Sequence, residues 1–139
     1  MPTNARAMSQ ETLTALGRAI ENLVFLSESD EPFELVDWDL SGQLLDQRRL
    51  LELGKHHPDS PVTVISVDDF FADLVRVQEW HGQHEKETVA KYQALLSILK
   101  QHLECIQVFC VGKIRKSIYV VGRCKDGRWA GVKTVSVET

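Results

Sequence analysis

The stretch SIYVVGRCKDGRWAGVKTVSV, residues 117–137, decides the fold class of this chain. β-Branched and aromatic residues dominate both of its halves, and Asp126-Gly127 between them is a strong signal for a tight β-hairpin. A further apolar run, residues 106–111, precedes it. We therefore expect the strands 106–111, 117–122 and 129–137 to form an antiparallel meander.

Upstream of the meander, helical and strand-like patterns alternate. Ser9 is a candidate N-cap for a first helix, whose apolar stripe recurs at helical spacing and whose end we expect at the polar cluster 27–30. Asp46 and Gly54 bracket a short helix, and Ser66 opens another. The remaining expected elements are strands over 33–39 and 62–67 and a long helix over 85–103. The fold class is α+β, with helices packed on a mixed sheet in one domain spanning residues 1–139.

Composition is ordinary for a globular protein, with 43% hydrophobic and 26% charged residues among 139. No apolar run approaches the roughly 20 residues that span a bilayer, and the first residues lack the apolar core of a signal peptide. The cysteines at 105, 110 and 124 have no metal-ligand spacing, so we interpret them as reduced thiols. These features predict a cytoplasmic protein that is not associated with a membrane.

Charge is distributed unevenly along the chain. Residues 1–40 hold eight acidic and two basic side chains, whereas residues 110–139 hold seven basic and two acidic ones. The acidic block is either a solvated edge or a face that attracts a basic protein partner. The net charge of −4 and the lack of interleaved exposed aromatic residues argue against direct nucleic-acid binding.

Candidate catalytic groups are sparse. His81 and His84 have a metal-like spacing, but no third ligand is evident, so solvent-exposed loop histidines are the simpler interpretation. Cys105 or Cys110 with His102 lacks a residue to orient the pair, and no glycine-rich phosphate loop is present. We predict a protein that is not an enzyme, with no catalytic residues, no cofactor and no metal of its own.

Acidic groups at two places suggest a binding site for another protein. Glu28 lies between Ser27 and Ser29 in an acidic segment, and Glu138 precedes Thr139, whose terminal carboxylate would follow a strand. Anions held on rigid elements suit another protein's metal ion or phosphate site, although a chain that simply stops there is the plainer alternative. Trp80, in a break between helices, is either an interface anchor or a lid over the core. Trp38 and Trp129 lie in expected strands and are assigned to the core.

Several short motifs occur one after another along nearly the whole chain. They are LVFLSESDEPFE at 23–34, Asp69-Phe70-Phe71, Gln78-Glu79-Trp80, VAKYQALL at 89–96, Ile118–Gly122, Ala130-Gly131-Val132 and Val137-Glu138-Thr139. Together they resemble the sugar-non-specific nuclease inhibitor family, also called nuclease A inhibitor-like proteins. Residues 40–61 match least.

The resemblance implies an α/β/α sandwich that binds a magnesium-dependent nuclease acting on both DNA and RNA and occludes its active site. It also implies that Glu28 and the Thr139 carboxylate approach the partner's metal and that Trp80 contacts the surrounding surface. The cationic residues Lys113, Arg115, Lys116, Arg123 and Arg128 depart from this pattern, since they would repel a basic nuclease if they faced it. The alternative function is a non-catalytic interaction module with the same fold and a different partner.

Overall fold

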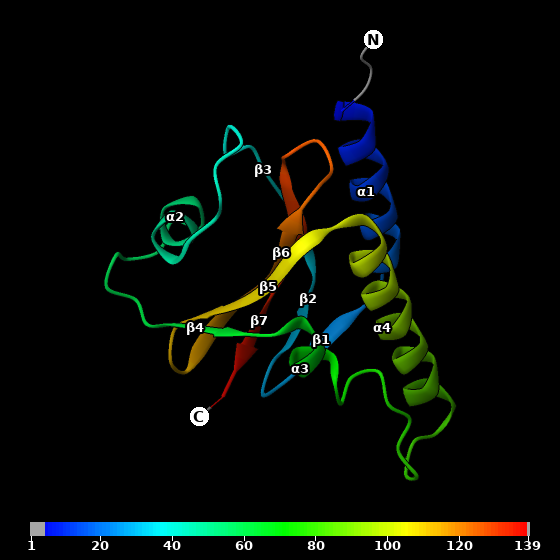
Figure 1. The fold of residues 1–139 in the computed structure, drawn as a ribbon. Helices are drawn as coiled ribbons and strands as arrows, with labels where there is room; N and C mark the ends of the chain where they lie inside the picture. Colours follow the sequence, from blue (N-terminus) through cyan, green and yellow to red (C-terminus); the bar gives the residue numbers. More distant parts are fainter. Residues whose placement is uncertain (1–4, 139) are drawn as a thin grey trace.

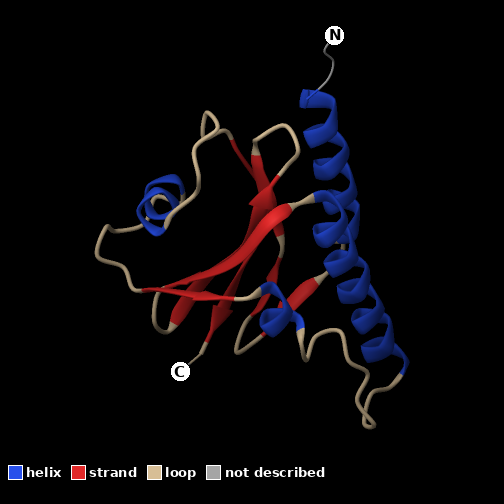
Figure 2. Cartoon of the chain, viewed as in Figure 1, coloured by secondary structure: helices blue, strands red, loops and turns tan. Residues whose placement is uncertain are grey.

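The structure, a computed structural model, describes the backbone of residues 5–138 and the side chains of residues 9–138. In chain order its elements are α1 (Ala5–Ala19), β1 (Val24–Leu26), β2 (Asp30–Pro32), β3 (Glu34–Trp38), α2 (Gln47–Leu53), β4 (Val62–Ile65), α3 (Val67–Phe71), α4 (Gln83–His102), β5 (Glu104–Val111), β6 (Arg115–Arg123) and β7 (Trp129–Val137). Figure 1 shows their arrangement, and Figure 2 shows the same view by secondary structure. The α+β fold class is confirmed.

A five-stranded sheet in the order β3-β7-β6-β5-β4 forms the centre of the molecule. The predicted meander β5-β6-β7 is present, with Val120 opposite Val132 in the β6–β7 register. The predicted mixed sheet is wrong, because all four neighbouring pairs are antiparallel. The reason lies in the connection after β4: α3 and α4 return the chain to the end of the sheet where β4 finishes, so that Ile65 pairs with Val108 near the start of β5.

Helices cover both faces of this sheet. On one face α1, α3 and α4 enclose a core that includes Leu16, Phe71, Leu99 and Val120. On the other face α2 covers a second core, built with Leu50, Phe109, Tyr119, Val121 and Trp129. Alternate residues of each strand enter alternate cores, as the two-residue period of a strand requires. The expected α/β/α layering is therefore confirmed, and Trp129 is a core residue at 2% exposure.

The first helix differs from the prediction at both ends. Helix α1 begins at Ala5, so Ser9 is a buried position inside it and not its N-cap. The helix ends at Ala19, and Asn22 takes the left-handed backbone conformation with φ 60°. Val24, the last residue of the apolar stripe, belongs to β1 instead, and the next residue, Phe25, packs against Phe33 and Phe70. Tertiary packing overrides the local periodicity here.

Other local signals are confirmed. The carboxylate of Asp46 accepts the backbone N–H of Arg49 at 2.8 Å and caps α2, whose C-cap is Gly54. The Ser66 hydroxyl accepts the N–H of Asp69 at 3.0 Å and caps α3, which ends at Phe71. Among residues 5–138, no helix combines the length and the apolar character that crossing a bilayer requires.

Candidate functional site

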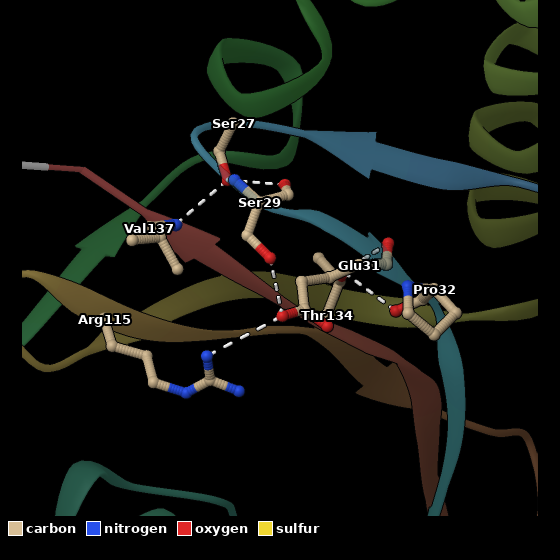
Figure 3. Close-up of polar contacts among 7 residues, drawn as sticks. All are labelled: Ser27, Ser29, Glu31, Pro32, Arg115, Thr134 and Val137. Atoms are coloured by element: carbon tan, nitrogen blue, oxygen red, sulfur yellow. Dashed lines mark hydrogen bonds and ion pairs between the residues drawn. The ribbon is translucent and has the colours of Figure 1, made fainter.

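The segment Ser27-Glu28-Ser29 is the turn of a small hairpin formed by β1 and β2, which pair as a two-stranded sheet separate from the main one. Within the turn, the Ser27 N–H donates to the Ser29 carbonyl at 3.1 Å. The Ser27 hydroxyl donates to the same carbonyl at 2.9 Å and accepts the Ser29 N–H at 3.3 Å. These bonds give the turn one compact backbone conformation (Figure 3).

The hairpin is fixed to the last strand of the main sheet. The Ser27 hydroxyl accepts the Val137 N–H at 3.0 Å, and the Glu28 N–H donates to the Val137 carbonyl at 3.1 Å. Further along β7, the Thr134 hydroxyl donates to the Pro32 carbonyl at 3.0 Å (Figure 3). Thr134 is 3% exposed, so this bond is buried between the main sheet and the hairpin. Both ends of the hairpin are thus attached to β7.

A polar chain connects the hairpin to β6 as well. The Ser29 hydroxyl donates to a carboxylate oxygen of Glu31 at 2.9 Å, and the Arg115 guanidinium lies 3.6 Å from the same oxygen (Figure 3). Ser27 and Ser29 are half-buried and hold the turn, whereas Glu28 between them is exposed. The structure therefore gives the two serines a supporting role and presents Glu28 to solvent.

Glu138 lies beside the same turn, because Val137 contacts Ser27 and Glu28. Its carboxylate forms an ion pair with the Lys116 ammonium at 2.8 Å. The hydrogen bond and charge of Lys116 lower the pKa of Glu138, and Glu138 in turn raises the pKa of Lys116. Glu138 is exposed and Lys116 is half-buried, so water still screens this pair. Thr139, the other predicted C-terminal site residue, lies outside the described residues.

Acidic side chains neutralise most of the basic residues of the C-terminal strands. Arg128 lies 3.0 Å from Asp37 and 3.4 Å from Asp39. Three further pairs join Arg115 to Glu31, Arg123 to Glu104 and Lys133 to Glu34. The sheet order explains this, since β3 pairs directly with β7 and brings the acidic N-terminal segment against the basic C-terminal one. The basic residues of the C-terminal strands therefore present much less net charge to a partner than the sequence suggests.

Trp80 lies in the loop between α3 and α4 and is 74% exposed, so it is not a lid over the core. Its ring contacts that of His81 at a centroid distance of 4.3 Å. Trp80 borders a hollow whose other wall includes Leu26, the residue directly before the Ser27 turn and itself 70% exposed. The hairpin and Trp80 thus belong to neighbouring parts of one surface, with Leu26 connecting them.

Within the part of the chain that the structure describes, no group of three or more His, Cys, Asp or Glu side chains is placed to hold a metal ion. The three cysteines are free, and burial raises the pKa of the Cys110 thiol, which disfavours its reactive thiolate form. His102 bonds to the Thr12 hydroxyl at 3.2 Å.

Residues that sequence reasoning missed hold the candidate site in place. They are Thr134, Val137, Glu31 and Arg115, which support the turn, and Leu26, which borders the hollow. One signal for Thr134 existed: it continues the face of Val132 in β7 with a polar side chain, a pattern that indicates a buried hydrogen-bond partner. Arg115 and Glu31 gave no such signal, because exposed charges are common at any position.

Comparison with known proteins identifies one family. The sequence model of the family described as nuclease A inhibitor-like protein matches residues 10–139. The match covers the hairpin, Trp80 and β7, the three parts that form the surface described above. No curated protein matches the chain.

Proposed function

Since the chain belongs to the nuclease A inhibitor-like family, we propose that it is a protein inhibitor that binds a magnesium-dependent nuclease acting on both DNA and RNA and covers its active site. The metal ion in this proposal belongs to the nuclease. The inhibitor contributes a surface, so inhibition is stoichiometric and needs no catalytic group.

The observation that supports the proposal best is an exposed carboxylate at the tip of a hairpin held on two sides. Glu28 is exposed, while hydrogen bonds to Val137 and Thr134 fix the backbone that bears it. A binding loop that is ordered before association loses little conformational entropy when it binds. A rigid, protruding turn is thus suited to enter a concave active site.

The chemistry of Glu28 matches that of such a site. Mg²⁺ prefers oxygen ligands and is usually held by one or two carboxylates together with substrate phosphate oxygens. A carboxylate from the inhibitor therefore replaces a phosphate oxygen of the nucleic acid. The acidic segment around it, which includes Asp30 and Glu34, favours association with a surface built to hold a polyanion.

Trp80 and the C-terminus complete the proposed contact surface. Trp80 supplies exposed aromatic area of the kind that is enriched among interface hot spots. A carboxylate from Thr139 near Glu28 remains a prediction from the resemblance, and an extension beyond Thr139 tests it. The cytoplasmic location likewise remains a prediction, and it fits a protein that protects its host from a nuclease destined for export.

The test is a titration of the tag-free protein into a magnesium-dependent non-specific nuclease that degrades plasmid DNA. We expect a sharp end point at one inhibitor per enzyme. Glu28→Gln should weaken inhibition by about tenfold or more, because it removes the charge directed at the metal. Glu11→Gln is the control, since Glu11 is an exposed carboxylate on α1.

Two outcomes would contradict the proposal at different levels. A folded protein that leaves the host's own nuclease fully active refutes inhibition and favours an interaction module with another partner. Full inhibition by Glu28→Gln refutes only the metal-directed mechanism and leaves occlusion by the rest of the surface.

A further inference from the structure

The hollow beside Trp80 lies between β1 and the N-terminal half of α4 and has a volume of about 190 Å³. Its walls are mainly apolar and include Val24, Leu26, Leu74, Val89 and Trp80. Leu26 and Trp80 are two of the most exposed large apolar side chains among the described residues. Apolar residues that line one hollow and remain exposed to water indicate a binding surface.

Four of the polar side chains that line the hollow form intramolecular hydrogen bonds or ion pairs, and His81 and His84 line it as well. The Tyr92 hydroxyl donates to the Val24 carbonyl at 3.0 Å, and the Thr88 hydroxyl donates to the His84 carbonyl at 3.1 Å. Asp73 is paired with Arg76 at 2.7 Å, and Glu85 accepts the Gly82 N–H at 2.9 Å. The apolar residues of the lining cannot pair with a polar ligand, which would lose hydrogen bonds to water on entering, whereas an apolar ligand loses none. The lining therefore favours an apolar occupant.

The volume sets the size of that occupant. A protein cavity of about 150 Å³ accommodates benzene, so this hollow accommodates one side chain of the size of leucine or phenylalanine. It is too small for a helix or a strand. The occupant is thus a single side chain that projects from a larger surface.

The position of the hollow indicates which surface provides the side chain that occupies it. Leu26 forms one wall and is followed directly by Ser27, so the hollow and the Glu28 turn are adjacent parts of one face. We propose that the hollow receives one large apolar side chain from the rim of the nuclease active site while Glu28 approaches the metal. This inference rests on the proposed function and adds a second contact of different chemistry. In it, Trp80 acts as the wall of a receptor site for the partner's side chain.

Filling the hollow tests the proposal. Thr88 lines it from α4, and Thr88→Phe places a ring where the partner's side chain would go. We expect Thr88→Phe to weaken binding to the inhibited nuclease about tenfold or more, measured as a dissociation constant by calorimetry. Ser97→Phe is the matched control, because Ser97 is an exposed residue on the same helix that is not among the lining residues. Leu26→Ala, which removes an exposed wall with little risk to folding, should also weaken binding.

A second measurement addresses the hollow without the nuclease. In an NMR titration, N-acetyl-leucinamide should shift the methyl signals of Val24 and Val89 saturably in the wild type and not in Thr88→Phe. N-acetyl-glycinamide, which lacks the apolar side chain, should shift them in neither. A titration without saturable shifts overturns the proposal.

The outcomes separate this inference from the proposed function. If the wild type binds no nuclease, the proposed function fails and the nuclease is excluded as the source of the side chain. If the wild type binds and Thr88→Phe binds equally well, only the role of the hollow is overturned. A dimer in sedimentation that Thr88→Phe dissociates would assign the hollow to a second copy of this chain and would also overturn the proposal.

Discussion

Replacing Thr134 with valine should loosen the hairpin that presents Glu28 while the main sheet stays intact. Valine has nearly the same shape as threonine, so it keeps the packing of this 3%-exposed position between β7 and the hairpin. The change removes the 3.0 Å hydrogen bond from the Thr134 hydroxyl to the Pro32 carbonyl. Pro32 is exposed, so water can satisfy its carbonyl once the hairpin opens. We therefore estimate the loss at the lower end for such a bond, about 1 kcal/mol.

Thr134→Ser is the matched control. Serine keeps the hydroxyl and loses one methyl group, whose burial is worth roughly 0.8 kcal/mol. The two variants should thus have similar global stability in urea unfolding. They should differ at the hairpin, because only Thr134→Val lacks the bond to Pro32.

Amide hydrogen exchange of Glu28 reports the difference directly, because its N–H donates to the Val137 carbonyl at 3.1 Å. A loss of about 1 kcal/mol in the free energy of hairpin attachment raises the opening equilibrium roughly fivefold. Exchange of the Glu28 amide, where it follows that equilibrium, should be faster by the same factor in Thr134→Val. Thr134→Ser should exchange at nearly the wild-type rate. Nuclease inhibition should weaken by at most the same factor, since Thr134 acts through the hairpin.

A double-mutant cycle identifies the route of this effect. If Thr134 acts by positioning Glu28, then Thr134→Val should add little to the loss already caused by Glu28→Ala. Equal exchange rates for Glu28 in the valine and serine variants would refute the reasoning. So would fully additive effects on the dissociation constant, which would indicate a general loss of stability.

Three further changes test other parts of the fold. Gly131→Ala should lower the free energy of unfolding in urea by about 3 kcal/mol or more, because a Cβ at this position would overlap the Val120 carbonyl of the paired strand. A variant with wild-type stability would contradict the β6–β7 register. Burial and the charge of Lys133 lower the pKa of His56 below its usual value of about 6.5, so the fold favours the neutral ring and loses stability as the pH falls from 7.5 to 5.5. His56→Gln should show a smaller loss over that interval, and equal losses would refute the assignment. Arg115→Gln should lower the free energy of unfolding by no more than about 1 kcal/mol, because the Arg115 side chain is exposed and lies 3.6 Å from the half-buried Glu31. A larger loss would show that this pair, and not the Thr134 bond, holds the hairpin.

Much of the secondary structure was predictable because its signals are local. Asp126-Gly127 between two β-branched runs predicts a hairpin from a few adjacent residues, and Asp46 and Ser66 predict helix starts from capping chemistry alone. The final helix was placed within about two residues of its observed ends, as its apolar stripe is long and regular. Glu28 and Trp80 were identified as candidate residues from their surroundings in the sequence and then from the resemblance, and the structure finds both exposed.

The errors and omissions arise where distant segments meet. The helical spacing of residues 13–24 continues past Ala19, where the helix ends. Residues 24–26 form β1 instead, and Phe25 packs there against Phe33 and Phe70. The antiparallel pairing of β4 with β5 depends on where the α3–α4 connection returns the chain, and that of β3 with β7 joins segments about a hundred residues apart, so no local pattern specifies either.

The chain therefore encodes its turns, helix caps and strand pattern locally, since each depends on the side chains of a few neighbouring residues. Only the tertiary structure decides that Thr134 and Val137 hold a turn more than a hundred residues away, that Arg128 is neutralised by Asp37, and that Leu26 and Trp80 border one hollow. These contacts depend on strand order and on the packing of layers, which determine the neighbours of residues far apart in the sequence.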